Sequence, residues 1–190
     1  MGMDISTLER ACAATEPVVA KVTPAHYGLA TPCNEWDVHD LLNHLVGTLH
    51  LGGALLADVP PTVAMGPGQL PPTDLVGDDP GTAYRRGVEA LLGAVDAGAI
   101  ERIHPTPLGD MPGTALAGFV ALDVVVHGWD LGRGVDAAPV VDDDLAAQLL
   151  GFARASFSAM PREPVLGPEV AVAPDAPPTD RLVAFTGRTP

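Results

Sequence analysis

One stretch of the chain, Gly113 to Gly134, constrains the fold more than any other. It reads GTALAGFVALDVVVHGWDLGRG and is nearly all apolar from Ala115 to Val126, as expected of a segment packed against neighbours on several sides. The valines at 124–126 would also suit a buried strand, but the length of the run favours a helix. Asp123 and His127 interrupt the apolar run. Four positions apart in a helix, they project from one face, one turn apart.

The polar pair in this helix needs partners, because a buried carboxylate or imidazole costs free energy unless it is bonded or coordinated. Asp123 and His127 can satisfy each other, another polar group, or a metal ion. Asp130 follows His127 by about one turn. It either orients a ligand imidazole by accepting its N–H or pairs with Arg133 at the helix surface. Trp129 is expected to pack against the end of the helix.

The composition narrows the functional classes. A chain of 190 residues fits one domain, and a 47% hydrophobic content with only 4% aromatic residues leaves Ala, Leu and Val to fill the core. The net charge of −14, with Lys21 the single lysine, argues against nucleic acid or an anionic membrane as partner, because both require clustered positive charge.

Targeting and redox signals are sparse. The N-terminus lacks the basic start and apolar core of a signal peptide, and no run of about 18 apolar residues reads as a membrane span. Two cysteines, Cys12 and Cys33, make neither a disulfide framework nor a Cys-rich metal site. These features predict a reduced, cytoplasmic protein. Cys33 is interpreted as a small packing residue, with a nucleophilic role as the alternative.

Periodicity and loop composition predict a single all-α domain over residues 1–190: a helical bundle with an irregular C-terminal extension at 161–190. The helix expected to begin the chain contains Pro17, which should bend or interrupt it. The second expected helix begins with Asp37 as N-cap. Expected helices cover 4–22, 37–57, 81–97, 113–134, 142–159 and 179–186; expected loops cover 23–35, the long surface loop 58–80, and 98–112; residues 169–173 read as a short strand.

Six histidines are present, and His44 is the one placed to join the polar pair. It lies on the inner side of the second expected helix, between Leu41 and Thr48. If that helix packs against the central one, His44 faces Asp123 and His127. Two imidazoles and a carboxylate form a common three-ligand set for zinc or a similar divalent metal. Spacing alone equally allows a buried Asp–His hydrogen bond. The other histidines fall on other faces or in loops: His26, His39, His50 and His104.

Three segments resemble a known family. TPCNEWDVHDLLNHLVG, ALDVVVHGWDLGRGVD and the closing DRLVAFTGRTP are similar to motifs of the DinB-like superfamily, in particular the mycothiol-dependent maleylpyruvate isomerase N-terminal type and an actinobacterial subgroup. The first motif places Trp36 before the helix cap Asp37. The resemblance implies a DinB-like four-helix bundle with a divalent metal held by His44, Asp123 and His127.

The sequence departs from the isomerase at two points. The isomerase has Glu at the acidic ligand position where this chain has Asp123, so the metal would lie nearer that helix or be bound through water. The isomerase also has a separate C-terminal domain, which a chain of this length is not expected to contain. Maleylpyruvate is therefore not the expected substrate.

The resemblance leads to three hypotheses. The first is a metal-dependent enzyme in which zinc, or else nickel or manganese, binds a low-molecular-weight thiol such as mycothiol for transfer to an electrophilic substrate or for isomerisation. The second is a non-catalytic bundle that binds metal or a small ligand, with a homodimer as the oligomeric form considered. In the third, no metal binds and Asp123 pairs structurally with His127.

Overall fold

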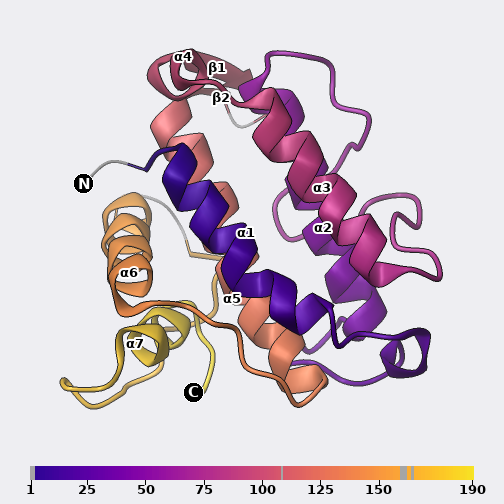
Figure 1. Ribbon diagram of the computed structural model, residues 1–190. Helices are drawn as coiled ribbons and strands as arrows, with labels where there is room; N and C mark the ends of the chain where they lie inside the picture. The colour runs from indigo at the N-terminus through magenta and orange to yellow at the C-terminus, as the bar shows by residue number, and fades with distance from the viewer. Residues whose placement is uncertain (1–2, 108, 159–161, 164) are drawn as a thin grey trace.

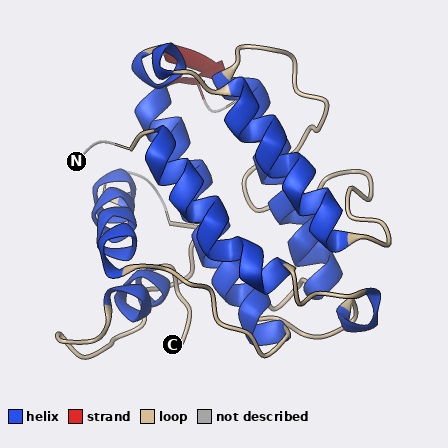
Figure 2. Cartoon of the chain, viewed as in Figure 1, coloured by secondary structure: helices blue, strands red, loops and turns tan. Residues whose placement is uncertain are grey.

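The computed structural model describes residues 3–107, 109–158, 162–163 and 165–190. Four long helices form a bundle (Figure 1). In it, α1 packs on α5, α2 packs on both α3 and α5, and α1 also contacts α3. Their bounds are α1 Ile5–Val19, α2 Val38–Leu56, α3 Pro80–Ala94 and α5 Gly113–Gly134. The predicted all-α, DinB-like four-helix bundle is confirmed, with a small hairpin as the one sheet among the described residues (Figure 2).

Two further helices lie on the side of α1 and α5 away from α2 and α3 (Figure 1). They are α6 (Asp143–Phe157) and α7 (Pro178–Phe185), which pack against each other and both touch α5. The short helix expected at 179–186 is therefore present as α7 and packs the C-terminal extension on the bundle, and Arg188 after it contacts Asp130 of α5.

Aspartates begin most of these helices. Asp4, Asp37, Asp79, Asp96 and Asp142 each accept a hydrogen bond from the backbone N–H three residues later. Such caps satisfy one of the free donors at a helix N-terminus, and the negative charge suits the positive end of the helix dipole. The predicted cap at Asp37 is confirmed, and part of the acidity of the chain serves this purpose.

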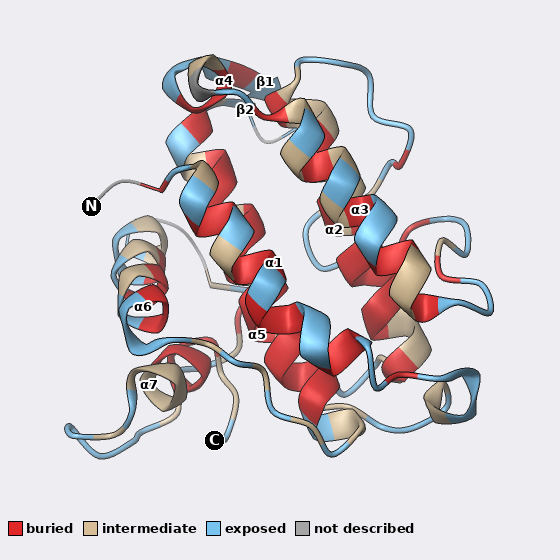
Figure 3. Ribbon diagram, in the orientation of Figure 1, coloured by how far each residue is buried: buried red, intermediate tan, exposed pale blue. Residues whose placement is uncertain are grey.

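The central helix α5 is buried along most of its length (Figure 3). Small residues let neighbours approach it: a Cβ at Gly128 would lie 2.3 Å from the hydroxyl oxygen of Thr15, which donates to the carbonyl of Val124 at 3.0 Å. By length and composition alone α5 could cross a membrane. Of its apolar window, 78% is buried within the protein, the pattern of a bundle core helix, so this is weak support for a membrane span.

The region between α3 and α5 differs from its prediction as a loop. It holds a short helix, α4 (Ala97–Glu101), and an antiparallel hairpin of β1 (Ile103–Thr106) and β2 (Gly109–Pro112). β1 contains His104, expected to be an ordinary loop residue. Its ring is fully buried, with Nδ1 2.7 Å from a carboxylate oxygen of Asp58 and Nε2 2.6 Å from another polar atom, the carbonyl oxygen of Ala99.

Smaller differences concern element ends. Pro17 lies inside α1, close to its C-cap Ala20, so the helix runs through the proline and ends before residue 22. Residues 169–173 form no strand; the backbone N–H of Val170 bonds instead to the carbonyl of Ala184. Residue 159, the predicted end of the fifth helix, lies outside the described residues. The long 58–80 segment is a loop up to Asp79, as predicted.

Candidate metal centre

Three side chains from two helices converge where α2 packs on α5. Nε2 of His44, on α2, lies 3.3 Å from Oδ1 of Asp123 on α5. Nε2 of His127, one turn along α5, lies 3.5 Å from the same oxygen. One potential ligand atom from each residue lies within 4.8 Å of the other two. The structure thus brings together the three residues that the sequence named; that they bind a metal stays a prediction.

The hydrogen bond of His44 to Gln69 shows which ring nitrogen carries a proton and holds the other one toward Asp123. Nδ1 lies 2.8 Å from the backbone carbonyl oxygen of Gln69. A carbonyl only accepts, so Nδ1 carries the proton and donates it. Nε2 then faces Asp123, as a donor to the carboxylate in the protonated ring or with its lone pair in the neutral ring that a metal requires. Burial acts to lower the pKa of His44, but Asp123 and the Gln69 carbonyl outweigh it and raise that pKa above its ordinary value. The ring is nearly fully buried, and the bond to Gln69 in the 58–80 loop fixes its orientation.

His127 has a similar arrangement on its far side. Its Nδ1 lies 3.0 Å from Oδ2 of Asp130, one turn further along α5. The carboxylate accepts from Nδ1, so the lone pair of the neutral ring is again on Nε2, toward Asp123. Asp130 therefore faces the imidazole and not Arg133, whose guanidinium lies over the ring of Trp129.

In the cluster, the Asp123 carboxylate faces Nε2 of both imidazoles. Nδ1 of each ring, on the opposite side, is bonded to Gln69 or to Asp130. Burial acts to raise the pKa of Asp123, but the imidazoles of His127 and His44 outweigh it and hold that pKa far below its ordinary value. Oδ2 of Asp123 is buried and has no close hydrogen-bond partner among the described residues, although a hydrogen bond from Thr48 also lowers the pKa of this carboxylate. The carboxylate needs positive charge beside it, which either protons on the two imidazoles or a metal ion bound between the three side chains would supply.

These distances suit a small divalent cation. Tetrahedral ligands about 2.0–2.1 Å from zinc lie about 3.3 Å from one another. The two Nε2 to Oδ1 separations, 3.3 and 3.5 Å, are close to that value. The shorter side chain of Asp123 reaches both imidazoles, so the departure from Glu does not separate the three groups. His44, Asp123 and His127 therefore fit a divalent metal.

Trp36 covers one side of the cluster. Its ring centroid is 4.6 Å from that of His44 and 5.9 Å from that of His127. The indole restricts both rings and keeps water from that side. The side chains of Asp123 and His127 retain 27% and 13% exposure, respectively, so the cluster stays partly open to solvent.

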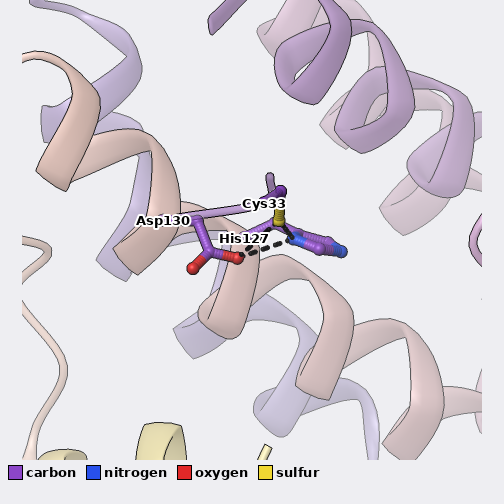
Figure 4. Close-up of side chains that lie close together, drawn as sticks. All are labelled: Cys33, His127 and Asp130. Atoms are coloured by element: carbon purple, nitrogen blue, oxygen red, sulfur yellow. Dashed lines mark hydrogen bonds and ion pairs between the residues drawn. The ribbon is translucent and has the colours of Figure 1, made fainter. Parts of the chain in front are cut away.

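A second group of side chains lies behind His127. Figure 4 shows Cys33 and Asp130 turned toward the His127 ring: Sγ is 3.8 Å from Nδ1 and 3.2 Å from Oδ2. Arg188, near the C-terminus, donates to both oxygens of Asp130, with Nη2 2.7 Å from Oδ2 and Nε 3.2 Å from Oδ1. Its Nη2 also lies 3.6 Å from Sγ of Cys33.

The second group also has distances compatible with a metal, through Cys33, His127 and Asp130. It is the poorer cation site, because the guanidinium of Arg188 already neutralises Asp130 and would repel a second cation. Although burial acts to raise the pKa of Asp130, hydrogen bonds from His127 and Arg188 lower it below its ordinary value. We therefore assign this group to supporting His127.

Sequence reasoning missed Cys33 and Arg188 as parts of the centre. Both lie in segments that carried the family resemblance, TPCNEWDVHDLLNHLVG and DRLVAFTGRTP. That shared motif membership was the signal available. Spacing held none, because Arg188 lies 155 positions from Cys33 and 58 from Asp130.

Cys33 is expected to react slowly with iodoacetamide in the folded protein. Burial and then the Asp130 carboxylate raise its pKa to about 12, against the opposing effect of Arg188. Relative to its ordinary pKa of 9.0, this leaves about 1,000-fold less thiolate at neutral pH. Mass spectrometry of native and urea-unfolded protein measures the labelling, with buried Cys12 as internal control. Rapid native labelling of Cys33 alone would favour the nucleophile hypothesis.

Comparison with known proteins identifies the family of the chain and agrees with its fold. A family described as the mycothiol maleylpyruvate isomerase N-terminal domain matches residues 8–132. Uncharacterized protein Rv0738 of Mycobacterium tuberculosis strain H37Rv and uncharacterized protein MT0763 of strain CDC 1551 are each 30% identical over 183 residues, covering 95% of this chain and of the relative. No solved structure matches significantly. The matched range contains the three candidate ligands, and the chain belongs to the mycothiol maleylpyruvate isomerase N-terminal domain family.

Proposed function

We propose that this protein binds one divalent metal, zinc in the first instance, through His44, Asp123 and His127. We further propose that it uses the metal to activate a low-molecular-weight thiol of the mycothiol type for transfer to an electrophile or for isomerisation. The observation that carries the proposal is the convergence of Nε2 of two imidazoles and a partly buried carboxylate from two helices, at separations that suit a divalent cation. A metal bound there would hold the thiol as a thiolate at neutral pH.

The charges around the centre favour an anionic thiolate over a neutral ligand. A divalent cation and the Asp123 carboxylate leave one net positive charge, since both imidazoles are neutral ligands. Asp130 and Arg188 cancel each other. A single thiolate would therefore neutralise the centre. A second carboxylate in the set would have removed that preference, so His44 and His127 support the thiol assignment through their lack of charge.

The chain's own residues would orient the centre and limit its access. Gln69 and Asp130 hold the two imidazoles by their Nδ1 protons. Trp36 closes one side. Solvent reaches the cluster on the exposed side of Asp123, which is where a small thiol and an electrophile would have to enter. Asn43 holds the 58–80 loop beside α2, with Oδ1 2.8 Å from the backbone nitrogen of Leu75 and Nδ2 3.1 Å from the carbonyl of Thr73.

Thiol binding tests this proposal. We expect a low-molecular-weight thiol to bind the zinc-loaded protein at least tenfold more tightly than the chelator-treated protein, because sulfur coordinates the metal directly. The affinity should rise with pH, since coordination displaces the thiol proton. Isothermal titration with mycothiol or a simpler thiol measures both effects, and the S-methyl thioether of the same compound serves as the matched control.

A second measurement separates catalysis from binding. Thiol consumption with a generic electrophile should be faster with zinc-loaded protein than with His127→Ala protein or free zinc. Equal thiol affinity for the loaded and chelated forms would contradict thiol activation. Tight thiol binding without any acceleration would favour the alternative function, a non-catalytic metal- or ligand-binding bundle.

A further inference from the structure

We propose that Arg188 is a positioning residue for the metal centre: by fixing Asp130, it holds Nε2 of His127 in place to bind metal. The proposal rests on the proposed metal binding but adds a contribution from the C-terminal segment. Arg188 lies outside the range matched by the family, which ends at residue 132. The site in this chain would then depend on a residue that the matched family domain does not supply.

Asp130 requires a cation. Its side chain is fully buried, and an ionised carboxylate without a counter-charge is costly there. The neighbours that contact it are the imidazole of His127, the thiol of Cys33 and the guanidinium of Arg188. Of these three, Arg188 alone carries a permanent charge, so it supplies the counter-charge of Asp130.

The geometry of this contact fixes the rotation of the carboxylate as well as its charge. Arg188 uses two nitrogens, Nε and Nη2, and reaches both oxygens of Asp130 at 2.7–3.2 Å. A two-point contact of this kind sets the plane of the carboxylate. Oδ2 is thereby held 3.0 Å from Nδ1 of His127, which sets the direction of the ring and of Nε2 on its other side.

The end of α7 is built to present Arg188. Gly187, with φ +95°, turns the chain after the helix, and its N–H bonds to the carbonyl of Ala184 at 3.0 Å. The N–H of Arg188 bonds to the carbonyl of Val183 at 3.0 Å. These two bonds are those of a Schellman ending with glycine in the left-handed conformation. Nη1 of Arg188 also donates to the carbonyl of Thr186, so the side chain is anchored at both ends.

Zinc affinity of tag-free variants tests the proposal. Arg188→Met removes the fork and the charge while keeping much of the apolar side chain. Arg188→Lys keeps a charge without the planar fork. Arg181→Met is the matched control, because it removes the same charge from α7 at a partly exposed position with no contact to the centre among the described residues. Affinity is measured by competition with a chromophoric chelator, at a temperature where circular dichroism shows each apo-protein folded.

We expect Arg188→Met to weaken zinc binding about tenfold, the lower end of the range for losing a direct outer partner of a ligand, because Arg188 acts on His127 through Asp130. Arg188→Lys should fall between it and the wild type, and Arg181→Met should match the wild type. A purely structural role would lower the apo melting temperature and leave the affinity of folded protein unchanged, and that result overturns the inference. If Arg188→Met does not fold, Arg188→Lys decides: reduced affinity supports the inference and wild-type affinity overturns it.

The same series distinguishes this inference from the proposed function. A wild type that binds no zinc would reject both. A wild type that binds zinc with an affinity shared by all folded Arg188 variants would leave the metal centre intact and reject only the role of Arg188.

Discussion

His44→Ala and His127→Ala are each expected to abolish stoichiometric metal binding while the protein stays folded. Each substitution removes one of three ligands, so the loss should exceed the 10- to 100-fold effect typical of an outer partner. The fold should survive, because the core is supplied by apolar side chains of all the long helices. Elemental analysis of protein purified without added metal or a histidine tag, followed by zinc titration, measures the effect. The wild type is expected to hold about one metal per chain.

His50→Ala is the matched control for these two variants. His50 lies on α2, as His44 does, but is half-buried and has no hydrogen bond to the centre among the described residues. Its removal should leave metal content unchanged. Loss of metal in all three variants would indicate a general effect of histidine removal or damage to α2. Retention of metal in the His44 variant together with its loss in the His127 variant would reject the assigned ligand set and favour the Cys33, His127 and Asp130 group. Retention in both variants would reject both groups, since both contain His127.

The bundle and the three converging residues could be predicted because they depend on local patterns. The apolar run predicts the helix α5, and the cap at Asp37 predicts where α2 begins. The helical spacing of the apolar residues of α2 predicts which of its faces is buried. Once α2 packs on α5, His44 must lie near Asp123 and His127. The family resemblance supplied the remaining step, that these two helices do pack together.

The parts that could not be predicted depend on distant partners. Arg188 is one of several arginines, and its contact with Asp130 follows only from how α7 packs on the bundle. Gln69 orients His44 through a backbone carbonyl, a group that every residue has, so no side-chain pattern reveals it. In the β1–β2 hairpin, the buried ring of His104 bonds to the carboxylate of Asp58, a residue 46 positions earlier. The periodicity of a single sequence does not predict any of these three tertiary contacts.

Zinc is expected to raise the unfolding temperature of the wild type substantially, and a chelator to lower it. A ligand that binds only the folded state at 1,000 times its Kd stabilises by about 4 kcal/mol. For a domain of this size each kcal/mol shifts the midpoint by about 2–4 °C, so the shift should be about 8–16 °C. Differential scanning calorimetry of wild type, His44→Ala, Asp123→Ala and His127→Ala, each with zinc and with chelator, measures it. The variants should lose most of the zinc-dependent shift.

The structural-pair hypothesis predicts a different pattern in the same measurements. If Asp123 and His127 only satisfy each other, removing either leaves a buried polar group unpaired and costs about 1–3 kcal/mol. Zinc and chelator would then change nothing in any protein. His44→Ala and His127→Ala would be coupled in the double variant even without a metal, because both rings face the same oxygen of Asp123, so the response to zinc and not additivity separates the two hypotheses. Under the metal hypothesis the double variant loses no more of the zinc-dependent shift than either single variant, because one missing ligand already removes it. A wild-type midpoint indifferent to both zinc and chelator would reject the metal centre, and the thiol chemistry proposed for it would be rejected with it.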